Sequence, residues 1–204
     1  LYSSQGEFRE TRAVSGLIGE GTGGVTEFLK RRVVVPATGS FAEFDHVFTH
    51  ELTHAFQLDL LAAGPGGGID PLSWTPPLWV MEGLSEYLSV PGVDAQTDMW
   101  LRDAALEGTL LTLEELSWVG DLRVYRFGQS IIAHIAEEFG DEMLGPWMRA
   151  MARRRSAERG TSETLGLTLE QLSEDWHAAL RRRHLPAVAR HEGLDASARQ
   201  LTEH

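Results

Sequence analysis

The sequence of 204 residues contains no cysteine, which excludes a disulfide framework, a thiol nucleophile and any zinc site built on thiolates. It has no uninterrupted apolar stretch of the ~18 residues that a membrane-spanning helix needs. Basic residues are few, because 18 Lys and Arg face 30 Asp and Glu, for a net charge of −12. A nucleic-acid groove or an anionic membrane surface needs the opposite sign, so neither is expected as a partner. A bound metal ion would need histidine and carboxylate ligands.

The overall composition, with 42% hydrophobic and 24% charged residues, is typical of a globular protein. The length fits one domain with a substantial core, or two small domains at most. The chain begins at Leu1, within an apparent strand, and no signal peptide is recognisable. These features predict a piece of a longer protein.

The pattern of the sequence changes near residue 40. Residues 1–39 are rich in glycine and β-branched residues and predict short strands at Thr11–Gly19, Gly24–Phe28 and Arg32–Val35. A capping box at Ser40–Glu43 then opens a helix that runs until the glycine-rich loop Gly64–Pro77. Strands followed by helices predict an α+β fold. Further helices are predicted at Leu78–Ser89, Asp94–Glu107, Leu113–Trp118, Phe127–Phe139, Asp141–Arg155 and Thr168–His184.

The strongest motif is His50-Glu51-Leu52-Thr53-His54, inside the predicted long helix. Its two histidines are four residues apart and project from one helix face. Both imidazoles can reach one Zn²⁺ at ~2.0–2.1 Å, with Glu51 beside the open coordination position as general base. The alternative interpretation is a pair of solvated helix histidines.

A catalytic zinc needs a third protein ligand. Downstream, Glu82 and Glu86 again lie four residues apart in a predicted helix. We predict that Glu82 completes a His₂Glu set and that Glu86 accepts the outer N–H of a ligating histidine. Taken alone, without the histidine pair, the two carboxylates would be better explained as the exposed face of an amphipathic helix.

The two motifs together resemble those of the gluzincin zinc metallopeptidases, in particular bacterial peptidase-MA-like domains. In that family HExxH is followed by P-x-W-x-x-E-G-x-x-E-Y, which matches Pro77–Tyr87 here. The match of the two motifs is specific, and a looser similarity extends over nearly the whole chain, including an N-terminal strand. The resemblance implies a thermolysin-like fold around zinc, with Glu82 as the third ligand.

The resemblance also implies a substrate-binding strand at Gly23, Gly24 and Val25, whose backbone would pair with an extended peptide. Gluzincin aminopeptidases carry there a glutamate that binds the substrate amine. Alignment on Gly23 puts Thr26 at that position, or Glu27 if the register shifts by one residue. We therefore predict an endopeptidase or oligopeptidase. The other interpretation of this segment is a glycine-rich turn that opens a strand.

One residue further along the chain, Tyr125, is also a candidate. Peptidase-MA-like domains carry Tyr-x-x-Gly at a helix start, matched here by Tyr125 and Gly128. In gluzincins a tyrosine or histidine hydrogen-bonds the oxyanion of the tetrahedral intermediate, a role that the resemblance suggests for Tyr125. An aromatic packed on the domain surface is the alternative. His134 lies in an apolar stretch and is expected to be a buried core histidine.

The C-terminal part predicts a domain boundary. Helical periodicity ends at His184-Leu185-Pro186, so we assign residues 1–186 to the zinc domain and 187–204 to a linker and the possible start of another domain. The segment Ala198–Thr202 resembles the first strand of a TolB-type β-propeller. Proteins with that pairing are usually exported, which implies a periplasmic or surface location.

These observations predict a zinc peptidase that hydrolyses peptide or protein substrates, with Glu51 as general base and then acid. The alternative is a catalytically weak or inactive binding module, with or without zinc, that serves recognition or docking beside a propeller. The presence of Glu51 favours catalysis, since a purely structural metal site has no use for a base.

Overall fold

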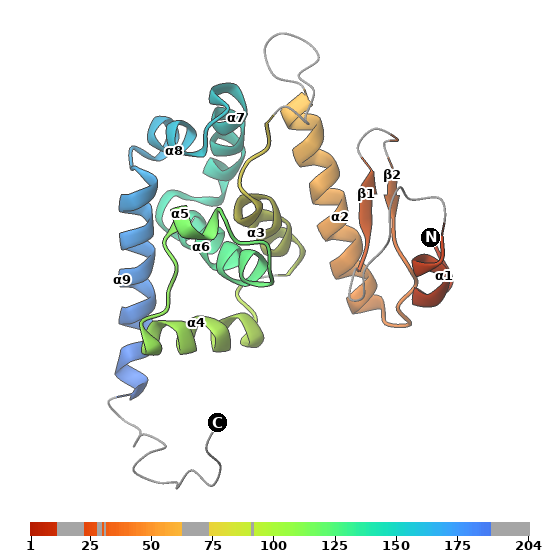
Figure 1. The fold of residues 1–204 in the computed structure, drawn as a ribbon, viewed down its shortest axis with the longest axis horizontal. Helices are drawn as coiled ribbons and strands as arrows, with labels where there is room; N and C mark the ends of the chain where they lie inside the picture. Colours follow the sequence, from red (N-terminus) through yellow and green to blue (C-terminus); the bar gives the residue numbers. More distant parts are fainter. Residues whose placement is uncertain (12–22, 28–29, 31, 63–73, 91, 189–204) are drawn as a thin grey trace, which may run out of the picture.

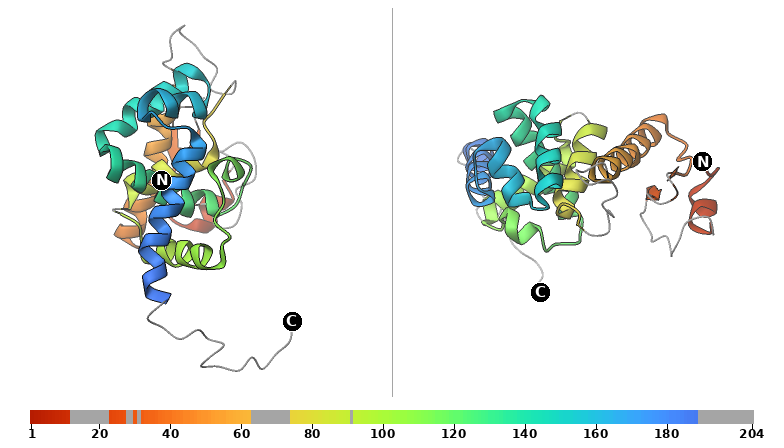
Figure 2. Two further views of the ribbon diagram at one scale, coloured as in Figure 1. Left: turned by 90° about the vertical axis from the view of Figure 1, so that its left-hand side faces the viewer. Right: turned by 90° about the horizontal axis from the view of Figure 1, so that it is seen from above.

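One long helix, α2 (Phe41–Ala62), lies between a small sheet and a body of packed helices (Figure 1). The computed structural model describes residues 1–11, 23–27, 30, 32–62, 74–90 and 92–188. The predicted cap of this helix is present, since the Glu43 amide donates to the Ser40 hydroxyl at 3.4 Å. Figure 2 shows the N-terminal segment and the C-terminal helices at opposite ends of the molecule. The helix α2 is therefore the element that both parts contact.

The sheet consists of β1 (Val25–Glu27) and β2 (Arg32–Val34), which pair antiparallel with Val25 opposite Val34. These strands confirm the second and third of the three predicted strands. Of the first predicted strand, Thr11–Gly19, every residue after Thr11 lies outside the described residues. The predicted N-terminal strand is wrong. Residues 1–11 contain a single β-bridge, between Tyr2 and Pro36, and the helix α1 (Gln5–Arg9).

The cause of that difference is local capping combined with one buried ring. Ser4 accepts a hydrogen bond from the Glu7 amide, the arrangement of a helix N-cap. Phe8 is fully buried and packs with Val34 of the sheet. A short helix thus buries its only apolar side chain, Phe8, against the predicted strand β2.

The helical body confirms most of the predicted helices. The chief exception is α8 (Ala157–Leu165), which was not predicted because its polar sequence has no apolar stripe. The Ser156 side chain caps the start of this helix. Helix α6 begins earlier than predicted, because Asp121 accepts a hydrogen bond from the Arg123 amide at 2.9 Å. The last helix continues through Pro186 instead of ending there. The elements are α3 (Leu78–Ser89), α4 (Ala95–Glu107), α5 (Leu113–Leu116), α6 (Arg123–Phe139), the 3₁₀ turn η2 (Asp141–Met143), α7 (Leu144–Arg154), α8 and α9 (Leu169–Val188).

The main core lies among α3, α6, α7 and α9, where the large side chains Trp79, Trp147 and Trp176 are buried. Each indole N–H has a partner. Trp147 donates to Thr161 and Trp176 to Ser130, both at 3.0 Å, and Trp79 donates to Ser117 at 3.1 Å. The architecture is mostly helical with one small antiparallel sheet, in agreement with the predicted α+β class. In the part of the chain that the structure describes, no helix is long and apolar enough to cross a membrane.

Helices α3 and α6 cross at a pair of glycines. A methyl group added to Gly128 would lie 2.5 Å from the Trp79 carbonyl oxygen and 2.9 Å from Gly83 Cα. A methyl group on Gly83 would overlap the backbone of Gly128. Only glycine at both positions allows this backbone approach, so the crossing fixes the position of α3 in the body.

We predict that Gly128→Ala lowers the free energy of unfolding by about 1–3 kcal/mol, because the two helices must separate. The melting temperature should fall by about 2–4 °C for each kcal/mol in a chain of this size. Gly145→Ala is the matched control on α7, where the nearest atom to an added Cβ belongs to the Arg149 side chain at 3.5 Å. The control should change stability little, because the helix propensity that alanine adds is offset by the restriction that Pro146 places on the preceding residue. Equal melting temperatures for the two variants would contradict the proposed crossing.

Candidate metal centre

Helices α2 and α3 bring three of the predicted ligands together. The Nε2 atoms of His50 and His54 are 3.1 Å apart, and each lies 3.1 Å from Glu82 Oε2. The two histidines come from successive turns of α2, and Glu82 faces them from the second turn of α3. The structure therefore brings the predicted His₂Glu set to a single point.

The tautomer of His54 is set by Gln57, a residue that the sequence analysis did not single out. The Gln57 amide N–H₂ donates to the Met81 carbonyl oxygen at 2.9 Å, which fixes the orientation of the amide. Its oxygen then lies 2.8 Å from His54 Nδ1 and accepts the proton carried there. A neutral His54 consequently presents the lone pair of Nε2 to the centre of the cluster.

His50 is oriented in the same way by Glu86. Glu86 Oε1 lies 2.9 Å from His50 Nδ1, on the side of the ring away from Glu82. This is the position that the sequence predicts for Glu86 as an outer support of a ligating histidine. The same oxygen also faces His46 Nε2 at 3.3 Å. His46 was missed, although its spacing of four residues from His50 is a usable signal.

The buried Glu86 and the half-buried Glu82 on either side of His50 favour a positive charge on its imidazole. Burial lowers the pKa of His50, but the hydrogen bonds to Glu82 and Glu86 outweigh it and raise that pKa to about 9. Burial raises the pKa of Glu82, yet the hydrogen bonds with His50 and His54 lower it to about 2. The pKa of Glu86 is likewise lowered to about 2, against the effect of burial, by hydrogen bonds with His46 and His50. Both carboxylates are ionised at neutral pH.

The cluster also has the dimensions of a zinc site. Three ligand atoms at mutual distances of 3.1 Å would subtend angles of about 100° at an ion about 2.0–2.1 Å from each. That angle is close to tetrahedral and leaves a fourth position open. With Nδ1 of both histidines directed at acceptors, both Nε2 atoms and a carboxylate oxygen point to one place, and a cation that replaces the Nε2 proton of His50 would meet two lone pairs and the carboxylate there. The residues present therefore fit a divalent zinc ion.

Glu51, the predicted general base, is buried on α2 and held by the sheet. The Thr26 hydroxyl lies 2.7 Å from Glu51 Oε2 and 2.8 Å from the Glu51 carbonyl oxygen. A methyl group on Gly24 would lie 2.6 Å from Glu51 Cγ and 2.9 Å from Oε1. The absence of a side chain at Gly24 thus makes room for the carboxylate, while Thr26 orients it.

Tyr125 approaches the cluster from the first turn of α6. Its ring is nearly parallel to that of His50, with centroids 6.0 Å apart and an interplanar angle of 19°. Burial and the charges of Glu82 and Glu51 raise the pKa of Tyr125 well above its usual range. The phenol stays protonated and can only be a donor toward an oxyanion at ordinary pH.

These groups share one cleft of about 350 Å³. Of the predicted substrate-binding residues, Gly24 and Val25 line it, whereas Gly23 lies against Val47 of α2. His134 is buried on α6 with 7% exposure, and burial lowers its pKa. It belongs to neither group of possible metal ligands found in the described ranges, as the sequence analysis expected. The cleft is also lined by Thr26, His50, Glu51, His54, Leu58, Thr75, Pro76, Leu78, Met81, Glu82 and Tyr125.

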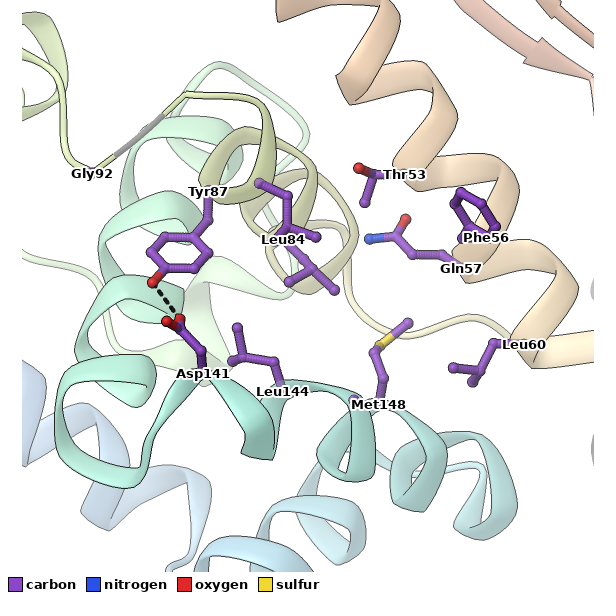
Figure 3. A pocket seen from close by; sticks show the side chains of 12 residues that line it. Thr53, Phe56, Gln57, Leu60, Leu84, Tyr87, Gly92, Asp141, Leu144 and Met148 are labelled. Carbon is purple, nitrogen blue, oxygen red and sulfur yellow. Dashed lines mark hydrogen bonds between the residues drawn. The ribbon is translucent and has the colours of Figure 1, made fainter.

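A second cavity, of about 510 Å³, lies where α2 and α3 meet α7 (Figure 3). Its lining is mainly apolar, including Phe56, Leu84 and Met148. Figure 3 shows Gln57 extending from α2 toward α3 beside this cavity. Gln57 therefore lines the apolar cavity and is also hydrogen-bonded to the His54 imidazole.

Comparison with known proteins gives no further guidance on these residues. No protein-family model matches the chain, and neither a curated protein nor a solved structure matches it.

We predict that Gln57→Leu lowers the free energy of unfolding by about 1–3 kcal/mol, because His54 and the Met81 carbonyl lose their shared partner in a buried place. Thermal unfolding of the purified variants measures this. Gln96→Leu is the control, since its partner Arg126 keeps a second bond to Asp94 at 3.1 Å. A Gln57 variant no less stable than the control would show that Gln57 does not hold α2 and α3 together.

Proposed function

We propose that the chain is a zinc metallopeptidase domain of the gluzincin type. The observation that carries the proposal is the convergence of His50, His54 and Glu82 within 3.1 Å of one another, with Glu51 in the same cleft. A structural zinc site uses four protein ligands, whereas three ligands and an open position are the arrangement of a catalytic one. The carboxylate of Glu51 then has a chemical use.

Each residue of the cleft has a defined task in this proposal. Bound zinc would polarise the scissile carbonyl and lower the pKa of a water molecule. Glu51 would take the proton on Oε1, because Oε2 is engaged by Thr26, and would later deliver it to the leaving amine. Tyr125 would donate a hydrogen bond to the developing oxyanion.

The surroundings of β1 support an endopeptidase or oligopeptidase. The Thr26 hydroxyl is committed to Glu51, so it is not available to bind a substrate amine. The neighbouring carboxylate of Glu27 is paired with Lys30 at 2.9 Å and with Arg32. Both positions proposed for an amine-binding group are therefore already occupied by internal contacts, and the backbone of Gly24 and Val25 is left to contact an extended peptide.

The wider assignments rest on the motifs. We propose a thermolysin-like arrangement around zinc, with residues 1–186 as the peptidase domain, although helix α9 reaches Val188. Residues 189–204 lie outside the described part of the chain. That they begin a β-propeller domain, and that the parent protein is periplasmic or otherwise exported, are proposals drawn from the resemblance of Ala198–Thr202.

Metal content tests the ligand set. Wild-type protein should hold about one tightly bound zinc per chain. Glu82→Gln should lose it, whereas Glu86→Gln should weaken zinc affinity by only about 10–100-fold, as changes in outer supports of metal ligands do. Elemental analysis after equilibration with buffered free zinc measures both. Equal losses in the two variants, or loss in Glu86→Gln alone, would overturn the assignment of Glu82.

Digestion of a peptide mixture tests the activity. Wild-type protein should cleave internal bonds, and Glu51→Gln at matched zinc content should be slower by a factor of at least about 100. Asp59→Asn, an exposed carboxylate on the same helix, is the control and should keep full activity. Products are identified by mass spectrometry. Stepwise loss of N-terminal residues would indicate an aminopeptidase, and zinc-loaded protein that cleaves nothing would favour the binding-module alternative.

A further inference from the structure

The histidines of α2 extend beyond the proposed zinc site. His46, His50 and His54 are spaced by four residues and therefore lie along one face of the helix. His46 Nε2 faces Glu86 Oε1 at 3.3 Å, and the same oxygen lies 2.9 Å from His50 Nδ1. Together these three residues offer ligand atoms within 4.8 Å of one another. Glu86 thus faces a histidine that has no task in the proposed reaction.

The separation of His46 and Glu86 is informative. A charge-assisted hydrogen bond between an imidazole and a carboxylate is about 2.7–2.9 Å long, shorter than the observed 3.3 Å. Two ligand atoms about 2.0–2.1 Å from a tetrahedral zinc ion lie about 3.3–3.4 Å apart. The observed distance matches the separation of two ligands on a tetrahedral zinc ion, and it is also that of a long hydrogen bond.

The burial of the pair is also suited to an ion. The Glu86 side chain is 9% exposed and anchored by His50, whereas that of His46 is 39% exposed. An ion between them would have a fixed carboxylate on one side and access to water on the other. Water molecules can complete the coordination, as they do in many sites with few protein ligands.

We propose that His46 and Glu86 form a second, weaker site for a divalent transition-metal ion such as Zn²⁺, on the Nδ1 side of the His50 ring. Imidazole and carboxylate are ligands that zinc accepts. Two protein ligands bind less tightly than three, so this site fills only after the His50–His54–Glu82 cluster. The proposal rests on the proposed function in so far as that cluster holds the first ion.

Occupation of the second site opposes binding at the first. A cation on Glu86 Oε1 withdraws electron density from the oxygen that accepts the His50 Nδ1 proton, and it adds a like charge near the first ion. Coupling between sites is reciprocal, so the first ion weakens the second by the same factor. Excess zinc should therefore reduce peptidase activity, and His46 would make the domain sensitive to the free zinc concentration.

The test compares His46→Gln with wild type in a zinc titration. Glutamine keeps an N–H group for Glu86 but removes the imidazole ligand. His177→Gln is the matched control, because His177 belongs to neither cluster and bonds the Leu111 carbonyl oxygen at 2.9 Å. Metal-free protein is equilibrated with chelator-buffered Zn²⁺, and bound zinc per chain is measured by elemental analysis.

Wild type and His177→Gln should each bind one zinc ion tightly. They should bind a second zinc ion only at a free zinc concentration at least about tenfold higher. In His46→Gln, the free zinc concentration that half-fills the tight site should stay within about threefold of the wild-type value. Binding of the second zinc ion should be lost. The inhibition of activity by excess zinc should disappear in the same variant. A second equivalent that persists unchanged in His46→Gln, or its absence from wild type, would overturn the second site. Absence of the tight equivalent from every protein would instead count against the proposed function.

Discussion

The backbone contact between Gly83 of α3 and Gly128 of α6 is the constraint on which the position of the site depends. Gly83 follows Glu82 directly, and Gly128 comes one helical turn after Tyr125. Because a methyl group at either glycine would overlap the opposite helix, the two residues set the distance between the helices. The crossing therefore places the carboxylate of Glu82, the proposed third ligand, and the phenol of Tyr125 at the same cleft. The packing of the body and the geometry of the site depend on the same two residues.

Electrostatics explains why the buried polar groups at this crossing form an ordered cluster. An isolated buried carboxylate or imidazolium is costly, and each is accepted only where partners satisfy it. Glu82, Glu86 and Glu51 each meet a donor, from the histidines or from Thr26. Gln57 fixes His54 in the same way through the Met81 carbonyl. The rotamers of the three proposed ligands are thus held by neighbours, which is the preorganisation that a metal-binding or catalytic site requires.

The sequence predicted the parts of this arrangement that have a local signal. The capping box at Ser40 and the helical spacing around His50 located α2, and the second motif located α3. Helices α1 and α8 were missed, because α1 has a single buried ring and α8 buries mainly small or polar side chains. Thr26 and Gln57 could not be assigned their contacts, since these depend on how the sheet and α3 pack against α2. His46 had a local signal in its spacing, yet its partner Glu86 is forty residues away in the chain.

Helix α2 carries two kinds of residue on different faces, and this division explains why one element serves both stability and chemistry. Gln57 and Leu61 are buried toward the body, whereas Glu51 meets Thr26 of the sheet. The histidines lie between these contacts and face α3. A shift of α2 along its axis would break the packing of Gln57 and the contact of Glu51 together. The geometry of the proposed site is therefore maintained by contacts on both sides of α2, and a change that loosens either side is expected to disturb metal binding before it unfolds the helical body.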